Sequence, residues 1–136
     1  MNIILVPKPD IDKVVKLIPE FLANAAKYTY GRFDANDIVQ ESKKLNKQLW
    51  VAFDKEILGF VVTEVVTYPK TKSLSMHFTA GKDLKLWKDP MLSVLRDFAK
   101  ETQCKQIESF GRRGWEKVFK NDGYKSKFKF YELPLE

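Results

Sequence analysis

Three side chains in the middle of the sequence could move protons: His77, Glu64 and Glu108. Histidine can take or release a proton near neutral pH, and a positioned carboxylate can act as a general base. All three lie in segments that we expect to be β-strands. Of the three, His77 and Glu64 are the candidate catalytic residues. The alternative is that His77 faces solvent in an alternating strand and that the glutamates only add charge to polar strand faces.

A second group of candidates lies in the basic last third of the chain. Residues 105–130 contain eight Lys/Arg and three Asp/Glu, in a protein of net charge +6. Arginine and aromatic residues are enriched at protein interfaces, so this region predicts a protein partner. The alternatives are a solvated lysine-rich surface and, for the aromatic residues, core filling. The candidate partner-binding residues are Arg112, Arg113, Trp115 and Lys117.

Composition limits the class of protein. The chain has 136 residues, of which 44% are hydrophobic, which suits one domain over residues 1–136. Cys104 is the only cysteine and His77 the only histidine, so an internal disulfide and a structural zinc site are both excluded. The N-terminus has no basic leader, and no apolar run approaches about 18 residues. We therefore expect an intracellular protein without a membrane span.

Hydrophobic periodicity and turn residues predict the elements that hold these candidates in place. The expected order is β-α-α-β-β-β-α-β-α-β, with a mixed, mostly antiparallel sheet flanked by helices. Asp10, Asp34 and Asp89 are expected helix N-caps, with Pro90 as a first helical residue and a kink or break at Pro19. The expected strands are 3–6, 49–53, 57–68, 74–79, 106–110 and 127–130, and the expected helices are 11–25, 35–45, 90–104 and 112–121.

Two local motifs accompany this order of elements. Leu49-Trp50-Val51-Ala52-Phe53, a short turn and Ile57-Leu58-Gly59-Phe60-Val61 form the first, and the second runs from Arg112 to Gly123-Tyr124. Together they resemble the GCN5-related N-acetyltransferase (GNAT, acyl-CoA N-acyltransferase) fold over nearly the whole chain. The second motif is similar to small GNAT-like proteins of tailed bacteriophages. The resemblance implies acetyl-CoA as cofactor and a primary amine as acetyl acceptor.

The resemblance also implies which residues should hold the cofactor. The family binds the pyrophosphate on a glycine-rich loop at a helix N-terminus, where backbone amides and the helix dipole favour anions. The matching segment here is Thr79, Ala80, Gly81 and Lys82, which has one glycine. If the next helix starts at Asp89-Pro90, a carboxylate and a missing amide spoil the phosphate site. The family's acid, a tyrosine on the last helix, aligns with Phe119, which has no proton to give.

These departures favour a GNAT-like scaffold that requires no cofactor. We expect a non-catalytic binding or assembly protein, in the host cytoplasm or the virion if it is phage-encoded, with a protein partner such as another phage structural protein and with a homo-oligomer as an option. The alternative is an N-acetyltransferase that moves an acetyl group from acetyl-CoA to a primary amine. Nucleic acid is the least favoured partner, because no nucleic-acid-binding motif accompanies the lysines.

Overall fold

Five strands form a single sheet in the order β1-β2-β3-β4-β5 in the computed structural model, which describes residues 1–110 and 122–136. The strands are β1 (Asn2–Leu5), β2 (Lys47–Phe53), β3 (Ile57–Thr67), β4 (Lys72–Gly81) and β5 (Gln106–Ser109). The helices are the short 3₁₀ helix η1 (Lys8–Asp10), α1 (Ile11–Val15), α2 (Pro19–Lys27), α3 (Ala35–Ser42) and α4 (Leu84–Glu101).

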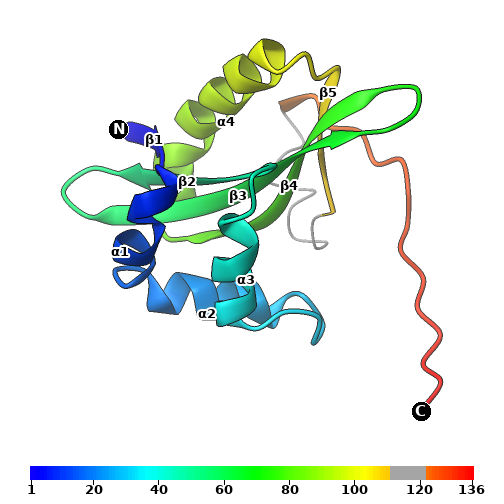
Figure 1. The fold of residues 1–136 in the computed structure, drawn as a ribbon, viewed down its shortest axis with the longest axis horizontal. Coiled ribbons are helices and arrows are strands. Elements are labelled where there is room, and N and C mark those ends of the chain that lie inside the picture. The colour runs from blue at the N-terminus through cyan, green and yellow to red at the C-terminus, as the bar shows by residue number, and fades with distance from the viewer. Residues whose placement is uncertain (111–121) are drawn as a thin grey trace.

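Strand pairing follows the predicted topology. β1 to β4 are antiparallel to their neighbours, and β5 pairs with β4 in parallel after the chain has passed through α4. The antiparallel meander and the parallel pair predicted from the sequence are therefore confirmed. The result is an α/β fold with a mixed five-stranded sheet flanked by helices (Figure 1).

Helices cover both faces of the sheet, so that there are two cores. Figure 1 shows α4 on one face and α1, α2 and α3 on the other. The core under α4 contains Trp50, Val61, Leu74, Met76, Trp87, Met91, Leu92 and Leu95. The core under the other three helices contains Ile11, Ile18, Leu22, Ile38, Val51, Phe60, Val62, Phe78 and Ala80.

The N-terminal helices agree with the sequence in two of three details. The expected break is present: α1 ends at Val15 and Pro19 begins α2, because the proline ring and missing N–H cannot continue a helix from the preceding turn. Asp34 caps α3 as expected, in a reciprocal capping box with Asp37. Asp10 stands at the N-cap position of α1, but its side chain makes no capping hydrogen bond because η1 leads directly into the helix.

The start of α4 differs from the prediction, and the difference affects function. The helix begins at Leu84, and Pro90 lies inside it, so Asp89-Pro90 is wrong as its N-terminus. A proline inside a helix removes the hydrogen bond to the carbonyl of Leu86 and costs about 3 kcal/mol. Burial of Trp87, which is 2% exposed, offsets this loss by fixing the first turn on the sheet.

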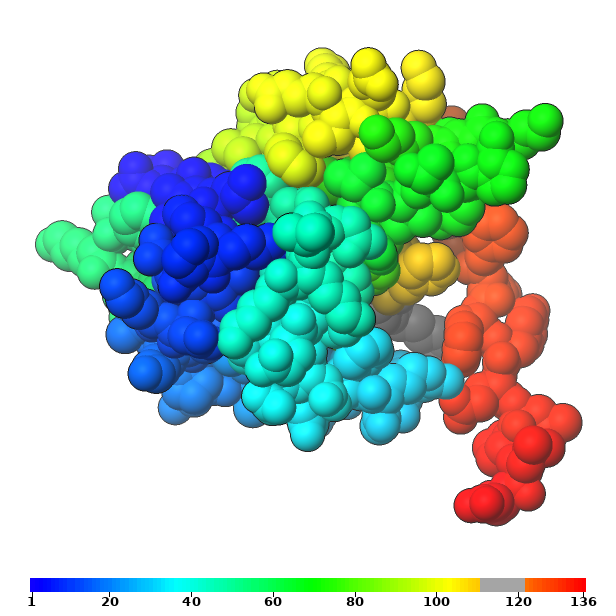
Figure 2. Space-filling model, viewed as in Figure 1, coloured from blue at the N-terminus to red at the C-terminus, as the bar shows by residue number. Residues whose placement is uncertain are grey.

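The C-terminal prediction is also wrong. No strand forms at 127–130, and residues 124–136 contain no helix or strand. Phe128, Phe130 and Tyr131 are 76–89% exposed, so core filling is excluded for these three aromatics. Alternation alone does not make a strand when no neighbouring strand is there to accept its hydrogen bonds. Figure 2 shows this segment projecting from one side of the molecule. The predicted helix 112–121 lies outside the described residues.

Within residues 1–110 and 122–136, no helix is both long and apolar enough to cross a membrane. The same residues contain no group of three or more His, Cys, Asp or Glu side chains that could hold a metal ion.

Glu41 provides a test of how α3 is attached to β2. Hydrogen bonds from Lys44 and Lys47 lower the pKa of the Glu41 carboxyl, and its side chain is only 18% exposed. A lowered pKa in the folded state means that this stabilisation is complete above the ordinary carboxyl range and is lost as pH falls through the lowered value. We expect E41Q to flatten the acid limb of the stability curve, measured by urea unfolding from pH 3 to 7. An unchanged acid limb, equal to that of the exposed control E101Q, would contradict this.

Candidate active site where strands β4 and β5 part

The pairing of β4 with β5 stops halfway along β4. It runs from Ser73 opposite Gln106 to Met76 opposite Ser109, whereas β4 continues to Gly81. A β-bulge lies at the same point, because Thr63 pairs with Met76 and Val62 with Phe78, which leaves His77 as an extra residue. The end of the pairing and the bulge together expose one edge of β4 within the described part of the chain.

The bulge brings the two predicted catalytic residues together. His77 Nε2 lies 2.6 Å from Glu64 Oε1, and the side chains are 25% and 22% exposed. Asn46, in the turn before β2, donates from Nδ2 to Glu64 Oε2 at 2.6 Å. The carboxylate is thus held at both oxygens. This arrangement has the form of a base with a partner that orients it.

Glu108, the third candidate, lies on β5 and contacts a different partner. Tyr68 donates its hydroxyl to Glu108 Oε1 at 2.8 Å. This hydrogen bond to the carboxylate raises the pKa of the Tyr68 phenol. Strand register places Glu64, Ser75 and Glu108 side by side on β3, β4 and β5. Ser75 is buried, so the expected solvent-facing alternation in β4 is wrong at this residue.

The predicted cofactor loop runs directly into α4. Thr79, Ala80 and Gly81 are the last residues of β4, and the backbone N–H of Lys82 donates to the Leu58 carbonyl at 2.8 Å. The Lys82 side chain forms an exposed ion pair with Glu56. The corrected start of α4 therefore places a helix N-terminus immediately after the segment of β4 that no described residue of β5 pairs with.

Trp87 fixes the position of this helix start. Its Nε1 donates to the Lys82 carbonyl at 2.9 Å, and its ring lies on the two glycines of adjacent strands. A Cβ at Gly59 would come within 2.3 Å of the ring, and a Cβ at Gly81 within 2.4 Å of the Leu58 carbonyl oxygen. Only glycine allows this close approach at both positions.

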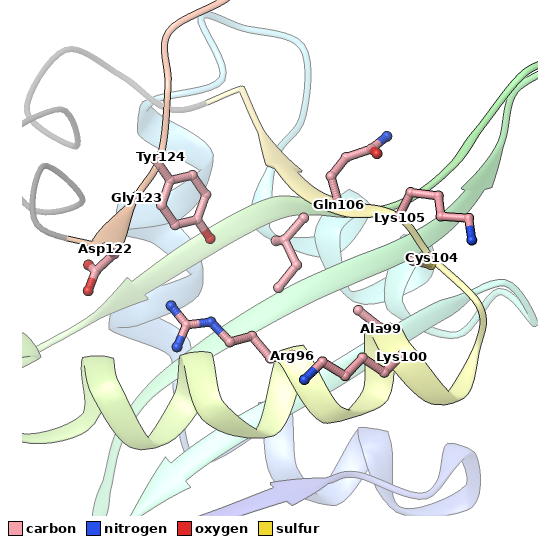
Figure 3. Close-up of a pocket in the computed structure, with 10 residues that line it drawn as sticks. Arg96, Ala99, Lys100, Cys104, Lys105, Gln106, Asp122, Gly123 and Tyr124 are labelled. Atoms are coloured by element: carbon pink, nitrogen blue, oxygen red, sulfur yellow. The ribbon is translucent and has the colours of Figure 1, made fainter.

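Tyr124 lies on the α4 face of the sheet, close to where the strands part. Its hydroxyl lies 3.5 Å from Met76 Sδ, and burial raises the pKa of Tyr124 to about 12. Residues of α4, β5 and the segment 122–124 line a cavity of about 260 Å³. Figure 3 shows the side chains of Tyr124 and Arg96 at this cavity. Arg96, Lys100 and Lys105 also line this cavity and give it a basic character. A tyrosine therefore approaches the site although Phe119 takes the expected place in the sequence.

Sequence reasoning missed some of these residues. Asn46 carries no local signal, because only the fold brings it to Glu64. Ser75 stands two residues before His77, so strand alternation could have placed both on one face. The partner-binding candidates Arg112, Arg113, Trp115 and Lys117 lie outside the described residues and stay predictions.

Comparison with known proteins supports the fold. No protein-family model matches the sequence, and no curated protein matches it. Among solved structures, the chain is similar to a probable acetyltransferase, with a TM-score of 0.74, 17% identity and coverage of 100% of this chain and 99% of that one. It is also similar to a ribosomal-protein-alanine N-acetyltransferase from Brucella melitensis biovar Abortus 2308, with a TM-score of 0.71, 15% identity and coverage of 99% and 100%.

A third similar structure carries the family name. It is a GNAT family acetyltransferase from Staphylococcus aureus, with a TM-score of 0.66, 16% identity and coverage of 99% of this chain and 100% of that one. At these identities, the likeness establishes architecture. The chain has the α/β fold of the GNAT acetyltransferases.

Proposed function

We propose that this protein is an N-acetyltransferase that transfers the acetyl group of acetyl-CoA to a primary amine. The observation that carries the proposal is the start of α4 at Leu84, directly after the part of β4 that pairs with β3 but, among the described residues, has no β5 partner. The expectation of an inert scaffold rested on the single glycine of the loop, on Asp89 and Pro90 at the phosphate site, and on Phe119 at the position of the family's tyrosine. Asp89 and Pro90 both lie inside the helix, so the objection based on these two residues no longer applies.

The residues around the helix start suit a pyrophosphate. The first N–H groups of an α-helix have no acceptor within the helix and favour anions. Leu84 and Lys85 would offer these amides, and the exposed side chain of Lys85 would add positive charge, as would Lys82, whose ammonium also pairs with Glu56. Asp83 opposes them, although its side chain does not cap the helix. Bound acetyl-CoA would supply an activated acetyl thioester at the point where β4 and β5 part.

The residues proposed to move protons lie on the two faces of the sheet. A primary amine attacks only when its nitrogen lone pair is free, so an ammonium proton must first be removed. Glu64, held by His77 and Asn46, is the proposed base on one face. Tyr124, whose pKa of about 12 keeps it protonated at neutral pH, lies on the other face. Its hydroxyl can donate a hydrogen bond to a departing thiolate.

Acetyl-CoA binding tests the proposal directly. A ligand that binds only the native state stabilises it by about 2.7 kcal/mol at 100 times its Kd. We expect millimolar acetyl-CoA to raise the Tm of the protein by several degrees, measured by differential scanning fluorimetry. K85E should reduce this rise by reversing a charge at the helix start. K70E changes an exposed lysine in the β3–β4 hairpin and should keep the rise. No rise in the wild type would overturn the proposal.

The second candidate is a non-catalytic binding or assembly role, including that of a phage structural protein. The observation that favours it is the exposed C-terminal segment, whose large hydrophobic side chains are unusual for a solvated surface. They are Phe128, Phe130, Tyr131, Leu133 and Leu135, all at least 76% exposed. A protein that shows no response to acetyl-CoA but binds a protein partner would fit this role.

A further inference from the structure

Strand β5 forms one edge of the sheet in the described part of the chain. It pairs with β4 on one side, and no described residue pairs with its other side. Such an edge can receive a further strand, because edge N–H and C=O groups lack strand partners. The edge has two chemically different faces. Ile107 packs in the core under α4, whereas Glu108 lies on the opposite face, where Tyr68 donates a hydrogen bond to it.

The cavity of about 260 Å³ is lined by β5 and by the C-terminal half of α4. Ala99 and Ile107 provide apolar walls, and Arg96 and Lys100 add positive charge. Cavities of about 150 Å³ already hold a benzene ring, and cations are attracted to the faces of aromatic rings. An aromatic side chain therefore suits this cavity. Arg96 is about three turns of helix beyond Leu84, so a group bound here leaves the start of α4 open.

The C-terminal segment has the residue pattern of a strand but no strand to pair with. Lysine and phenylalanine alternate from Lys127 to Phe130, and Pro134 sets the end of the pattern, because proline cannot donate to a strand ladder. Phe128 and Phe130 are 89% and 76% exposed. Large apolar side chains that are exposed together in this way mark an interaction surface.

Contacts within the same chain do not bring this segment to β5. The segment projects from the molecule (Figure 2), and its described side-chain contacts are with Arg32, in the loop between α2 and α3. Arg32 forms an ion pair with Glu132 at 2.5 Å and lies 5.1 Å from the centre of the Phe130 ring. Both partners of the ion pair are about half exposed, and exposed ion pairs contribute little to stability. The segment can therefore leave this position at low cost.

Charge and hydrophobicity select one way of placing the segment on the edge of β5. In one phase of the alternation, both phenylalanines lie on the α4 face, at the cavity, and both lysines lie on the face of Glu108. The opposite phase would place the lysines against Arg96 and Lys100 and the phenylalanines beside a carboxylate. The segment and the edge are thus complementary on both faces in a single phase.

We propose that this protein forms a twofold dimer in which residues 126–133 of each copy add as a strand to β5 of the other copy. A twofold exchange covers both edges and both cavities at once, so no further copy can add. The four phenylalanines alone would bury roughly 600–1,000 Å², and the two strand ladders add to this area. Specific interfaces begin at about 1,200 Å². The inference goes beyond the proposed function and does not depend on acetyl-CoA.

The mass in solution tests the dimer. In sedimentation velocity at micromolar concentration, we expect twice the chain mass of 15.9 kDa. F128D/F130D should weaken the dimer at least about a hundredfold, the effect of losing two aromatic anchors, with an unchanged far-UV circular dichroism spectrum. L45D removes a leucine that is 96% exposed elsewhere and should leave the dimer intact. A monomeric wild type, or a dimeric F128D/F130D, would overturn the proposal.

Exchange of charges shows whether the segment of one copy meets β5 of another. E108K and K127E/K129E should each weaken the dimer about tenfold or more, because like charges then face each other. Mixed in equal amounts, the two variants should dimerise like the wild type, since each β5 then receives a segment of opposite charge. Pairing within one chain cannot give this rescue. K13E/K16E, with the same charge change at exposed positions of α1 and the turn after it, should dimerise unaided. A mixture that stays monomeric contradicts the exchange.

The dimer and the acetyltransferase fail separately. A monomer whose Tm rises with acetyl-CoA would overturn the dimer alone. A dimer whose Tm does not respond to acetyl-CoA would overturn the acetyltransferase alone.

Discussion

Replacing Trp87 with alanine is expected to lower the free energy of unfolding by about 3–5 kcal/mol, the usual effect of removing a buried tryptophan. The side chain is 2% exposed and donates its indole N–H to the Lys82 carbonyl. Urea denaturation with unchanged m-values measures the loss. L86A, one residue earlier and 59% exposed, should change stability by less than about 0.5 kcal/mol. A loss below about 1 kcal/mol in W87A would contradict this account of α4.

Gly59, which lies against the Trp87 ring, gives a second test of how this ring holds α4 on the sheet. G59A adds a Cβ that would come within 2.3 Å of Trp87, so it should destabilise the wild type strongly. In the W87A background the ring is gone, and the same change should cost much less. A double-mutant cycle therefore gives a coupling energy between the two residues. Additive effects would mean that the close approach does not constrain α4.

Glu64→Gln is expected to reduce kcat/KM for amine acetylation by about 10²–10⁴-fold, the range for loss of a general base. Glutamine keeps the size of the side chain and can still contact Asn46 and His77, but it cannot accept the amine proton. Steady-state rates with 1,4-diaminobutane measure the effect. The rise in Tm with acetyl-CoA should persist in E64Q, since the residue is distant in sequence and fold from the start of α4.

E101Q is again the matched control for the loss of a carboxylate. It should retain the wild-type rate. If E64Q keeps more than about a third of wild-type kcat/KM, then the Glu64–His77 contact is structural and the base lies elsewhere.

Local patterns predicted the parts of the fold that local interactions determine. Asp34 and Asp37 sit three residues apart and form a capping box, and Pro19 breaks a helix by its own geometry. The start of α4 depends on non-local contacts. Asp89-Pro90 has the typical form of a helix start, but Trp87 of α4 packs on Gly59 of β3 and Gly81 of β4, and that packing outweighs the local preference.

In the candidate site too, residue types could be predicted from the sequence, whereas the contacts between them depend on the fold. Glu64 and His77 could be chosen by residue type, but their contact needs the extra residue in β4, which no periodicity reveals. The prediction of a C-terminal strand was wrong for a related reason. Phe128 and Phe130 alternate with lysines, yet a strand also needs a partner, and the sequence does not say whether one is present.

The bulge at His77 also determines which face of the sheet each side chain of β4 occupies before and after it. Leu74 and Met76 face α4, whereas Phe78 and Ala80, which are also even-numbered, face the other helices. The extra residue shifts the alternation of side chains by one position, and that residue is His77, which contacts the proposed base Glu64. Any substitution at His77 preserves the phase, whereas a deletion would exchange inside and outside for the rest of the strand. Length at this position is therefore constrained by packing, independently of the chemistry that the side chain performs.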